Sequence, residues 1–88
     1  MWRIEFDPAV EKELRRLGPE ATRRILRFLR ERVAVLDNPR NLGEALHGPE
    51  FGRFWKYRVG DYRVVASIQD QAILILVVRV GHRSDVYT

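Results

Sequence analysis

Residues 51–80, FGRFWKYRVGDYRVVASIQDQAILILVVRV, decide the expected fold because they contain three apolar-rich runs separated by short polar links. The runs are Phe51–Arg58, Tyr62–Gln69 and Ala72–Val80. Links as short as Val59-Gly60-Asp61 and Asp70-Gln71 are typical of β-hairpins, so the three strands should pair antiparallel as a meander. The last run is apolar on both parities until Arg79, which predicts an interior strand covered on at least part of both faces.

Upstream of the meander, residues 2–6 alternate apolar and charged side chains, as a strand with one buried face does. Asp7 and Pro8 then supply a helix N-cap and a first helical residue. Gly18-Pro19 predicts a tight corner, because glycine can end one helix and proline can open the next. Asn38-Pro39 ends the second helix, since a residue before proline disfavours helical backbone. These signals predict a helical hairpin.

The expected fold is therefore α+β. It consists of an N-terminal strand, the helical hairpin, a connecting loop over residues 40–50 and the three-stranded antiparallel meander, with both helices on one face of the sheet. The 88 residues suit a single domain over positions 1–88, because two halves would each be too small to bury an adequate core.

Composition excludes several classes of protein. The chain has no cysteine, so neither disulfides nor a thiolate metal site can support the fold. The longest apolar run, residues 72–78, is too short to span a bilayer, and the charged N-terminal stretch is unlike a signal peptide. We therefore expect a cytoplasmic protein that does not associate with a membrane.

Charge favours a polyanionic partner. The chain carries 16 basic and 12 acidic residues, a net charge of +4, and only Lys12 and Lys56 among the basic residues are lysines. The planar guanidinium of arginine suits bidentate contact with phosphate and stays charged at physiological pH.

Strand parity predicts where these charges gather. In the run 62–69, Val64 and Ala66 belong to an apolar face that the helices should cover, which leaves Arg63 on the other face. In the last run, Arg79 shares a parity with Val77. If the parities align across the turns, four cations lie on the face away from the helices: Lys56, Arg58, Arg63 and Arg79. A cluster of like charges fits an anion-binding surface, and it also fits a purely structural face that solvent screens.

Other chemistries lack the residues that they need. The two histidines are far apart in the sequence, and the carboxylates are scattered without metal-ligand spacing, so we predict neither a metal nor a cofactor. Glu44 and Glu50 lie in the loop without an evident partner. No glycine-rich phosphate loop or nucleophile elbow is present, which argues against nucleotide hydrolysis and serine-type acyl transfer.

Several motifs together resemble those of RelE-type toxins in the RelE/ParE superfamily. They are Leu46-His47-Gly48, Lys56, Gly60-Asp61-Tyr62-Arg63-Val64-Val65, Val80-Gly81-His82-Arg83 and Asp85-Val86-Tyr87. The match extends over nearly the whole chain, and the Gly-Asp-Tyr-Arg turn and the closing Gly-His-Arg-Ser-Asp-Val-Tyr are its most specific parts.

The resemblance implies a toxin of a bacterial or archaeal type II toxin–antitoxin system. Its activity would be that of an mRNA interferase, a ribosome-dependent and metal-independent endoribonuclease that inhibits translation. A cognate antitoxin would wrap the toxin and block it, in a complex that is hetero-oligomeric.

The resemblance also implies roles for individual residues. Arg63 would clamp the scissile phosphate and Arg83 would stabilise its developing charge. Lys56 would hold charge or exchange a proton. Tyr87 would stack on a base or transfer a proton, and His82 is the imidazole of the tail. The implied catalytic set is Arg63, Arg83, Lys56, Tyr87 and His82, and the implied RNA-binding residues are Arg58 and Arg79.

Two departures from RelE bear on the chemistry. Phe54 stands where RelE has a second lysine, so a proton acceptor is missing from the family pattern. The segment between Arg83 and Tyr87 is also shorter than in RelE. Two alternatives therefore stay open: a ParE-like poison of DNA gyrase without nuclease activity, and a degraded toxin that only binds its antitoxin.

Overall fold

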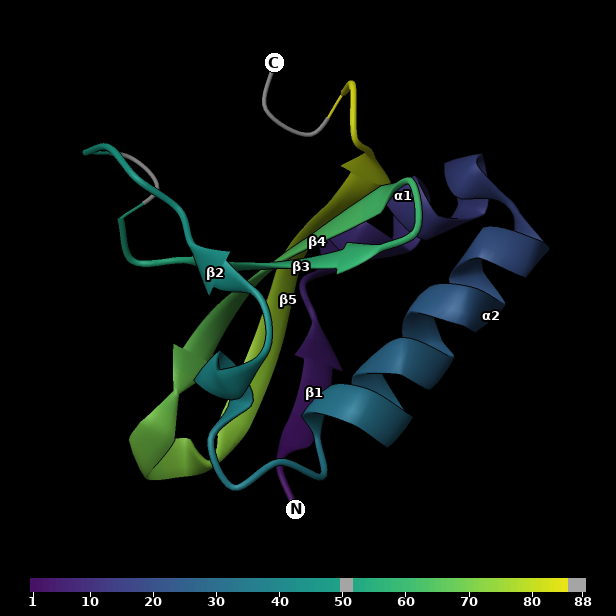
Figure 1. Cartoon of the computed structure of the whole chain (residues 1–88). Helices are drawn as coiled ribbons and strands as arrows, with labels where there is room; N and C mark the ends of the chain where they lie inside the picture. The colour runs from purple at the N-terminus through teal and green to yellow at the C-terminus, as the bar shows by residue number, and fades with distance from the viewer. Residues whose placement is uncertain (50–51, 86–88) are drawn as a thin grey trace.

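A five-stranded sheet in the order β1-β5-β4-β3-β2 organises the chain (Figure 1). The computed structural model describes residues 1–49 and 52–85. The strands are β1 (Arg3–Phe6), β2 (Glu44–Ala45), β3 (Trp55–Val59), β4 (Tyr62–Gln69) and β5 (Leu74–His82). The helices are α1 (Pro8–Leu17) and α2 (Pro19–Phe28), and α2 continues as a π-helix over Leu29–Val33. The predicted α+β fold, with a helical hairpin and an antiparallel meander, is confirmed.

The first strand departs from the antiparallel pattern. Strands β2 to β5 pair antiparallel, whereas β1 runs parallel to β5, with Arg3 opposite Leu74 and Phe6 opposite Val77. Strand β5 therefore lies between β1 and β4, which confirms the prediction of an interior strand. Its apolar residues on both parities follow from this central position.

The predicted bounds of two strands and of the connecting loop were wrong. Strand β3 begins at Trp55, because Gly52 and Arg53 form a turn in which the Gly52 N–H donates to the Gly48 carbonyl. Phe51, where the strand was predicted to start, lies outside the described residues. Strand β5 runs from Leu74 to His82 because a short 3-10 turn occupies Asp70–Ala72. The predicted loop 40–50 also contains β2, which adds a fifth strand at the edge of the sheet.

The start of α1 and the corner between α1 and α2 form as the sequence predicts. The Asp7 side chain accepts a hydrogen bond from the Ala9 N–H, and Gly18 takes a φ of 98° between the two helices. The second helix ends earlier than its proline suggests, since helical structure stops at Val33. The Ala34 carbonyl there accepts from the Trp2 N–H, so the segment that precedes β1 satisfies a carbonyl at the helix end.

The core lies between the helices and one face of the sheet. Its fully buried members are Val10, Ile25, Leu29 and Val33 from the helical segment, and Tyr57, Val64, Ala66, Ile75 and Val77 from the sheet. Burial raises the pKa of the Tyr57 hydroxyl, which donates to the Pro39 carbonyl at 2.7 Å and so ties β3 to the segment after the helices. Among the described residues, no helix is long and apolar enough to cross a membrane.

A bidentate ion pair fastens the far end of the sheet. Both terminal nitrogens of Arg40 donate to the Asp70 carboxylate at 2.9 Å, joining the segment after the helices to the β4–β5 connection. The hydrogen bonds from Arg40 hold the pKa of Asp70 below its usual range. Forked pairs of this geometry are stronger than single exposed contacts.

Replacing Asp70 tests this ion pair through pH. Because the pKa of Asp70 is lowered in the folded state, its stabilisation is present above the unfolded value of about 3.9 and is lost as pH falls through the folded pKa. We expect Asp70→Asn to melt below wild type near neutral pH, with a difference in Tm that shrinks below about pH 4. The exposed Asp37→Asn is the control. A Tm gap for Asp70→Asn that is independent of pH would contradict this account.

Candidate nucleic-acid interface

The sheet face opposite the helices gathers the four predicted cations. Lys56 is opposite Val65 in the strand register, Arg58 is opposite Arg63, and Val65 is opposite Arg79. Directly opposed residues of an antiparallel pair share a face, so all four cations leave the sheet on the same side. We call this set, Lys56, Arg58, Arg63 and Arg79, the basic face.

A register shift between β4 and β5 puts Arg79 on the basic face. Val65 is opposite Arg79, but Ala66 is opposite Val77, so Val78 is an extra residue in β5. Strict alternation would group Arg79 with the buried Val77. That parity assignment was wrong, because the bulge turns the two side chains to opposite faces.

The β3–β4 turn holds Arg63. Gly60 has a φ of 61°, the left-handed conformation that a two-residue hairpin turn needs at its first central position. The Arg63 side chain folds back on this turn, and its Nη1 donates to the carbonyls of Gly60 at 3.0 Å and Tyr62 at 2.9 Å. Arg63 is only 8% exposed, so its guanidinium is held in a fixed orientation.

His82 is the last residue of β5, and Arg83 follows it at the same end of the sheet. The Arg83 N–H donates to the Asp61 carbonyl at 2.8 Å, which sets its backbone beside the turn that Arg63 contacts. His82 is opposite Tyr62. Tyr62 is two residues from the buried Val64 and so lies on the core face of the sheet, which puts His82 on the side opposite the basic face. Its ring packs edge-on against Tyr62, and its Nδ1 lies 2.9 Å from Ser84 Oγ. Tyr87 lies outside the described residues.

Lys56 has a carboxylate beside it that the sequence did not reveal. Glu44 of β2 is opposite Lys56, and its Oε1 lies 3.6 Å from Lys56 Nζ. The prediction that Glu44 has no partner was therefore wrong. Trp55 fixes this edge, because its indole Nε1 donates to the Leu42 carbonyl. Gly43 then passes so close to β3 that an added Cβ would collide with the Lys56 carbonyl oxygen.

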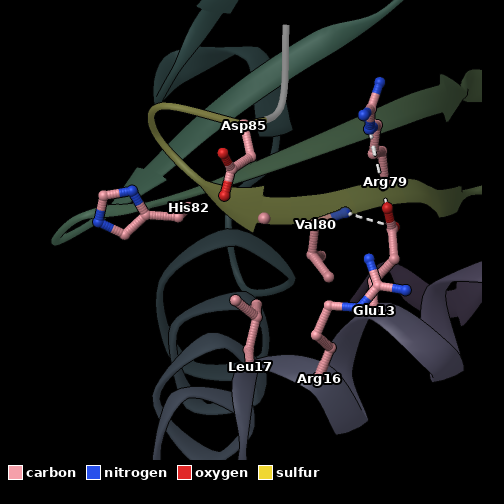
Figure 2. Close-up of a pocket in the computed structure, with 8 residues that line it drawn as sticks. Glu13, Arg16, Leu17, Arg79, Val80, His82 and Asp85 are labelled. Carbon is pink, nitrogen blue, oxygen red and sulfur yellow. Dashed lines mark hydrogen bonds and ion pairs between the residues drawn. The ribbon is translucent and has the colours of Figure 1, made fainter. Parts of the chain in front are cut away.

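Arg79 is partly neutralised by a helix residue. Glu13 of α1 accepts from the Val80 N–H through Oε1 at 3.0 Å, and its Oε2 lies 3.7 Å from Arg79 Nε (Figure 2). Strand β1 ends at Phe6, opposite Val77, so it does not reach Val80. Glu13 therefore accepts the hydrogen bond from the Val80 N–H along an edge of β5 that β1 does not cover. The hollow beside it, about 100 Å³, is also lined by Arg16 and His82.

These residues have the chemistry of an anion site with one carboxylate. The Arg63 side chain and the Arg83 backbone N–H both bind the turn, and Lys56 lies farther along the basic face next to Glu44. Guanidinium groups bind phosphate and stabilise charge that develops on it, and a carboxylate can accept a proton. Among residues 1–49 and 52–85, no group of three or more histidine and carboxylate side chains could hold a metal ion.

Sequence reasoning missed Glu44 and Glu13 because both depend on tertiary contacts. Glu44 belongs to a strand of only two residues, too short to show a period. One signal was present: Gly43 precedes Glu44, and a glycine beside a strand often marks close backbone approach. Glu13 lies in a regular helix, and nothing local distinguishes it from an exposed carboxylate.

Comparison with known proteins identifies relatives over nearly the whole length. Residues 4–87 match the family described as the ParE toxin of type II toxin-antitoxin system, parDE. The mRNA interferase toxin RelE of Escherichia coli K12 is 32% identical over 87 residues, covering 97% of this chain and 88% of that protein.

Solved structures share the fold. The toxin-antitoxin complex RelBE2 of Mycobacterium tuberculosis matches with a TM-score of 0.78 at 23% identity, covering 96% of this chain and 93% of that one. The archaeal RelE-RelB complex of Pyrococcus horikoshii matches with a TM-score of 0.71 at 27% identity, covering 96% and 97%.

Two glycines allow a matched test of the Glu44 edge. Gly43 and Gly48 both have a positive φ, but an added Cβ has open space at Gly48 and meets β3 at Gly43. We expect Gly48→Ala to cost about 1 kcal/mol of unfolding free energy from backbone strain. Gly43→Ala should cost about 1–3 kcal/mol more, because the backbone of β3 cannot yield. Equal decreases in denaturant titrations would show that the close approach contributes nothing.

Proposed function

This chain belongs to the ParE toxin family of type II toxin–antitoxin systems, and from its 32% identity to the mRNA interferase RelE we propose that it is an endoribonuclease that cuts messenger RNA on the ribosome. It is an mRNA interferase, related over nearly its full length to RelE. Cleavage of translated messages stops protein synthesis. The activity belongs to a single domain over residues 1–88, acting in the cytoplasm where ribosomes work.

One observation carries the proposal: the Arg63 side chain and the Arg83 backbone N–H bind the same hairpin turn, on a sheet whose basic face includes Lys56. A clustered set of cations is costly without an anion, and the planar guanidinium of arginine matches the geometry of a phosphodiester. The burial of Arg63 supports a functional role, because a charge removed from water interacts more strongly with a bound phosphate.

The reaction that suits these groups is transphosphorylation. The RNA 2′-oxygen attacks the adjacent phosphorus, an O2′–P bond forms, and the P–O5′ bond breaks to leave a cyclic phosphate. The 2′-hydroxyl proton goes to an acceptor, and the departing 5′-oxygen takes a proton from water. Arg63 and Arg83 offset the negative charge that builds on the phosphate oxygens.

Glu44 is the acceptor that we assign to the 2′-hydroxyl proton. Phe54 replaces the second lysine of RelE, whereas the Glu44 carboxylate lies 3.6 Å from Lys56. Lys56 then holds charge beside the reacting groups. Arg58 and Arg79 remain predicted RNA-binding residues, with the charge of Arg79 reduced by Glu13. Roles for His82 and Tyr87 in proton transfer also remain predictions.

An antitoxin protein is the expected partner. The solved relatives from Mycobacterium tuberculosis and Pyrococcus horikoshii are complexes of a toxin with its antitoxin. By analogy we propose that a cognate antitoxin binds this chain in a hetero-oligomeric complex and blocks its access to the ribosome.

Purified chain added to ribosomes that carry a defined message tests the activity. We expect cleavage within the translated region, and no cleavage of the same message without ribosomes. Arg63→Ala should lower the cleavage rate about 10²–10³-fold, the usual cost of removing one group that stabilises transition-state charge. Primer extension measures the cut ends, and a melting curve verifies that the variant folds.

The matched control is Arg3→Ala, which removes an exposed arginine at the other end of the sheet. An intact message together with inhibited DNA gyrase would replace this proposal with the gyrase-poison alternative. Intact message and active gyrase would favour a degraded toxin.

A further inference from the structure

The β3–β4 turn is contacted by arginines from two faces of the molecule. An added Cβ on Gly60 would lie 2.7 Å from Nη2 of Arg24, which belongs to α2 on the helix side of the sheet. Arg63 binds the Gly60 carbonyl from β4, and the Arg83 N–H binds the neighbouring Asp61. Positive charge therefore continues around the tip of the hairpin from the candidate site to the helix.

Helix α2 and its π-helical extension carry that charge onward. Five exposed arginines lie along them, and we call this set the α2 arginine surface: Arg23, Arg24, Arg27, Arg30 and Arg32. Only two acidic residues, Glu20 and Glu31, share residues 19–33 with them. The contact between Arg27 and Glu31 is long, 3.9 Å, and exposed, so it offsets little of the charge.

The α2 arginine surface is hollowed where it meets the sheet. A hollow of about 290 Å³ is lined by Arg24, Arg27, Phe28, Glu31, Arg32 and Val59, so it joins α2 to the last residue of β3. A second hollow, about 240 Å³, lies between Glu20, Arg23, Arg24 and Arg27. Arg24 and Arg27 line both hollows, so the two are adjacent.

We propose that the α2 arginine surface binds the phosphate backbone of RNA that extends beyond the cleavage site around the β3–β4 turn. The inference rests on the proposed RNA-cleaving function and adds a second contact area, on the opposite side of the sheet from the basic face. Arg24 is the link, because it contacts the turn and also lines the hollows on α2.

The residue type and its location favour RNA over an acidic protein segment. Arginines one helical turn apart, about 5.4 Å, present a row of guanidinium groups that suits repeated phosphates and carries no base specificity. Continuity with the candidate site through Arg24 is a further reason, since one RNA strand could contact both. Such contacts make binding depend strongly on salt.

A salt titration of RNA binding tests the proposal. The probe is a short fluorescent RNA with methylated 2′-hydroxyls, which the chain cannot cleave. We expect Arg24→Gln to weaken binding roughly fivefold at low salt. The double variant, Arg24→Gln with Arg27→Gln, should reduce the slope of log K against log salt by about 0.7 for each phosphate that is no longer neutralised. Arg24→Lys, which keeps the charge, should restore most of the slope.

The control is Arg3→Gln, which removes the same charge at the far end of the sheet, and melting curves compare the folded fraction of every variant. Wild-type chain that fails to bind the probe but still cuts message on ribosomes would overturn only this inference, whereas failure in both assays would contradict the proposed function itself. Wild-type binding with Arg24→Gln and Arg27→Gln indistinguishable from Arg3→Gln would overturn only this inference. Unchanged RNA binding with weakened antitoxin binding would assign the surface to the antitoxin instead.

Discussion

The pairing of β4 with β5 is the constraint on which both the core and the candidate site depend. One extra residue in β5 separates Val77 from Arg79, so that Val77 packs under the helices and Arg79 faces away from them. Without that bulge, the alternation that buries Ile75 and Val77 would direct Arg79 into the core, where an unpaired charge is costly. The division between an apolar face and a basic face therefore depends on a local irregularity as well as on strand period.

The protein tolerates its clustered cations by satisfying them in different ways. Arg63 donates to backbone carbonyls of a turn, Lys56 lies beside Glu44, and Arg79 lies beside Glu13. Carbonyl acceptors orient a guanidinium without cancelling its charge, whereas a carboxylate does both. Arg63 thus keeps more of its capacity to attract phosphate than Arg79 does. This difference is the structural reason for assigning the central role to the turn.

The sequence predicts the elements better than it predicts the side-chain environments. Period-two alternation, Asp7-Pro8 and Gly18-Pro19 were enough for the helical hairpin and the meander, because these signals act over a few residues. Strand β2, the parallel pairing of β1 and the bulge at Val78 were missed, since each is decided by a distant segment. For the same reason, only the strand register reveals that Lys56 pairs with Glu44 and on which face His82 lies.

The most direct test of the central claim is a map of messenger-RNA 5′ ends in bacteria after brief induction of the wild-type chain. The account predicts new ends inside translated regions, in frame with codons, in most expressed messages, and it predicts that they disappear when translation initiation is blocked beforehand. Growth arrest with an unchanged map of message ends would contradict it.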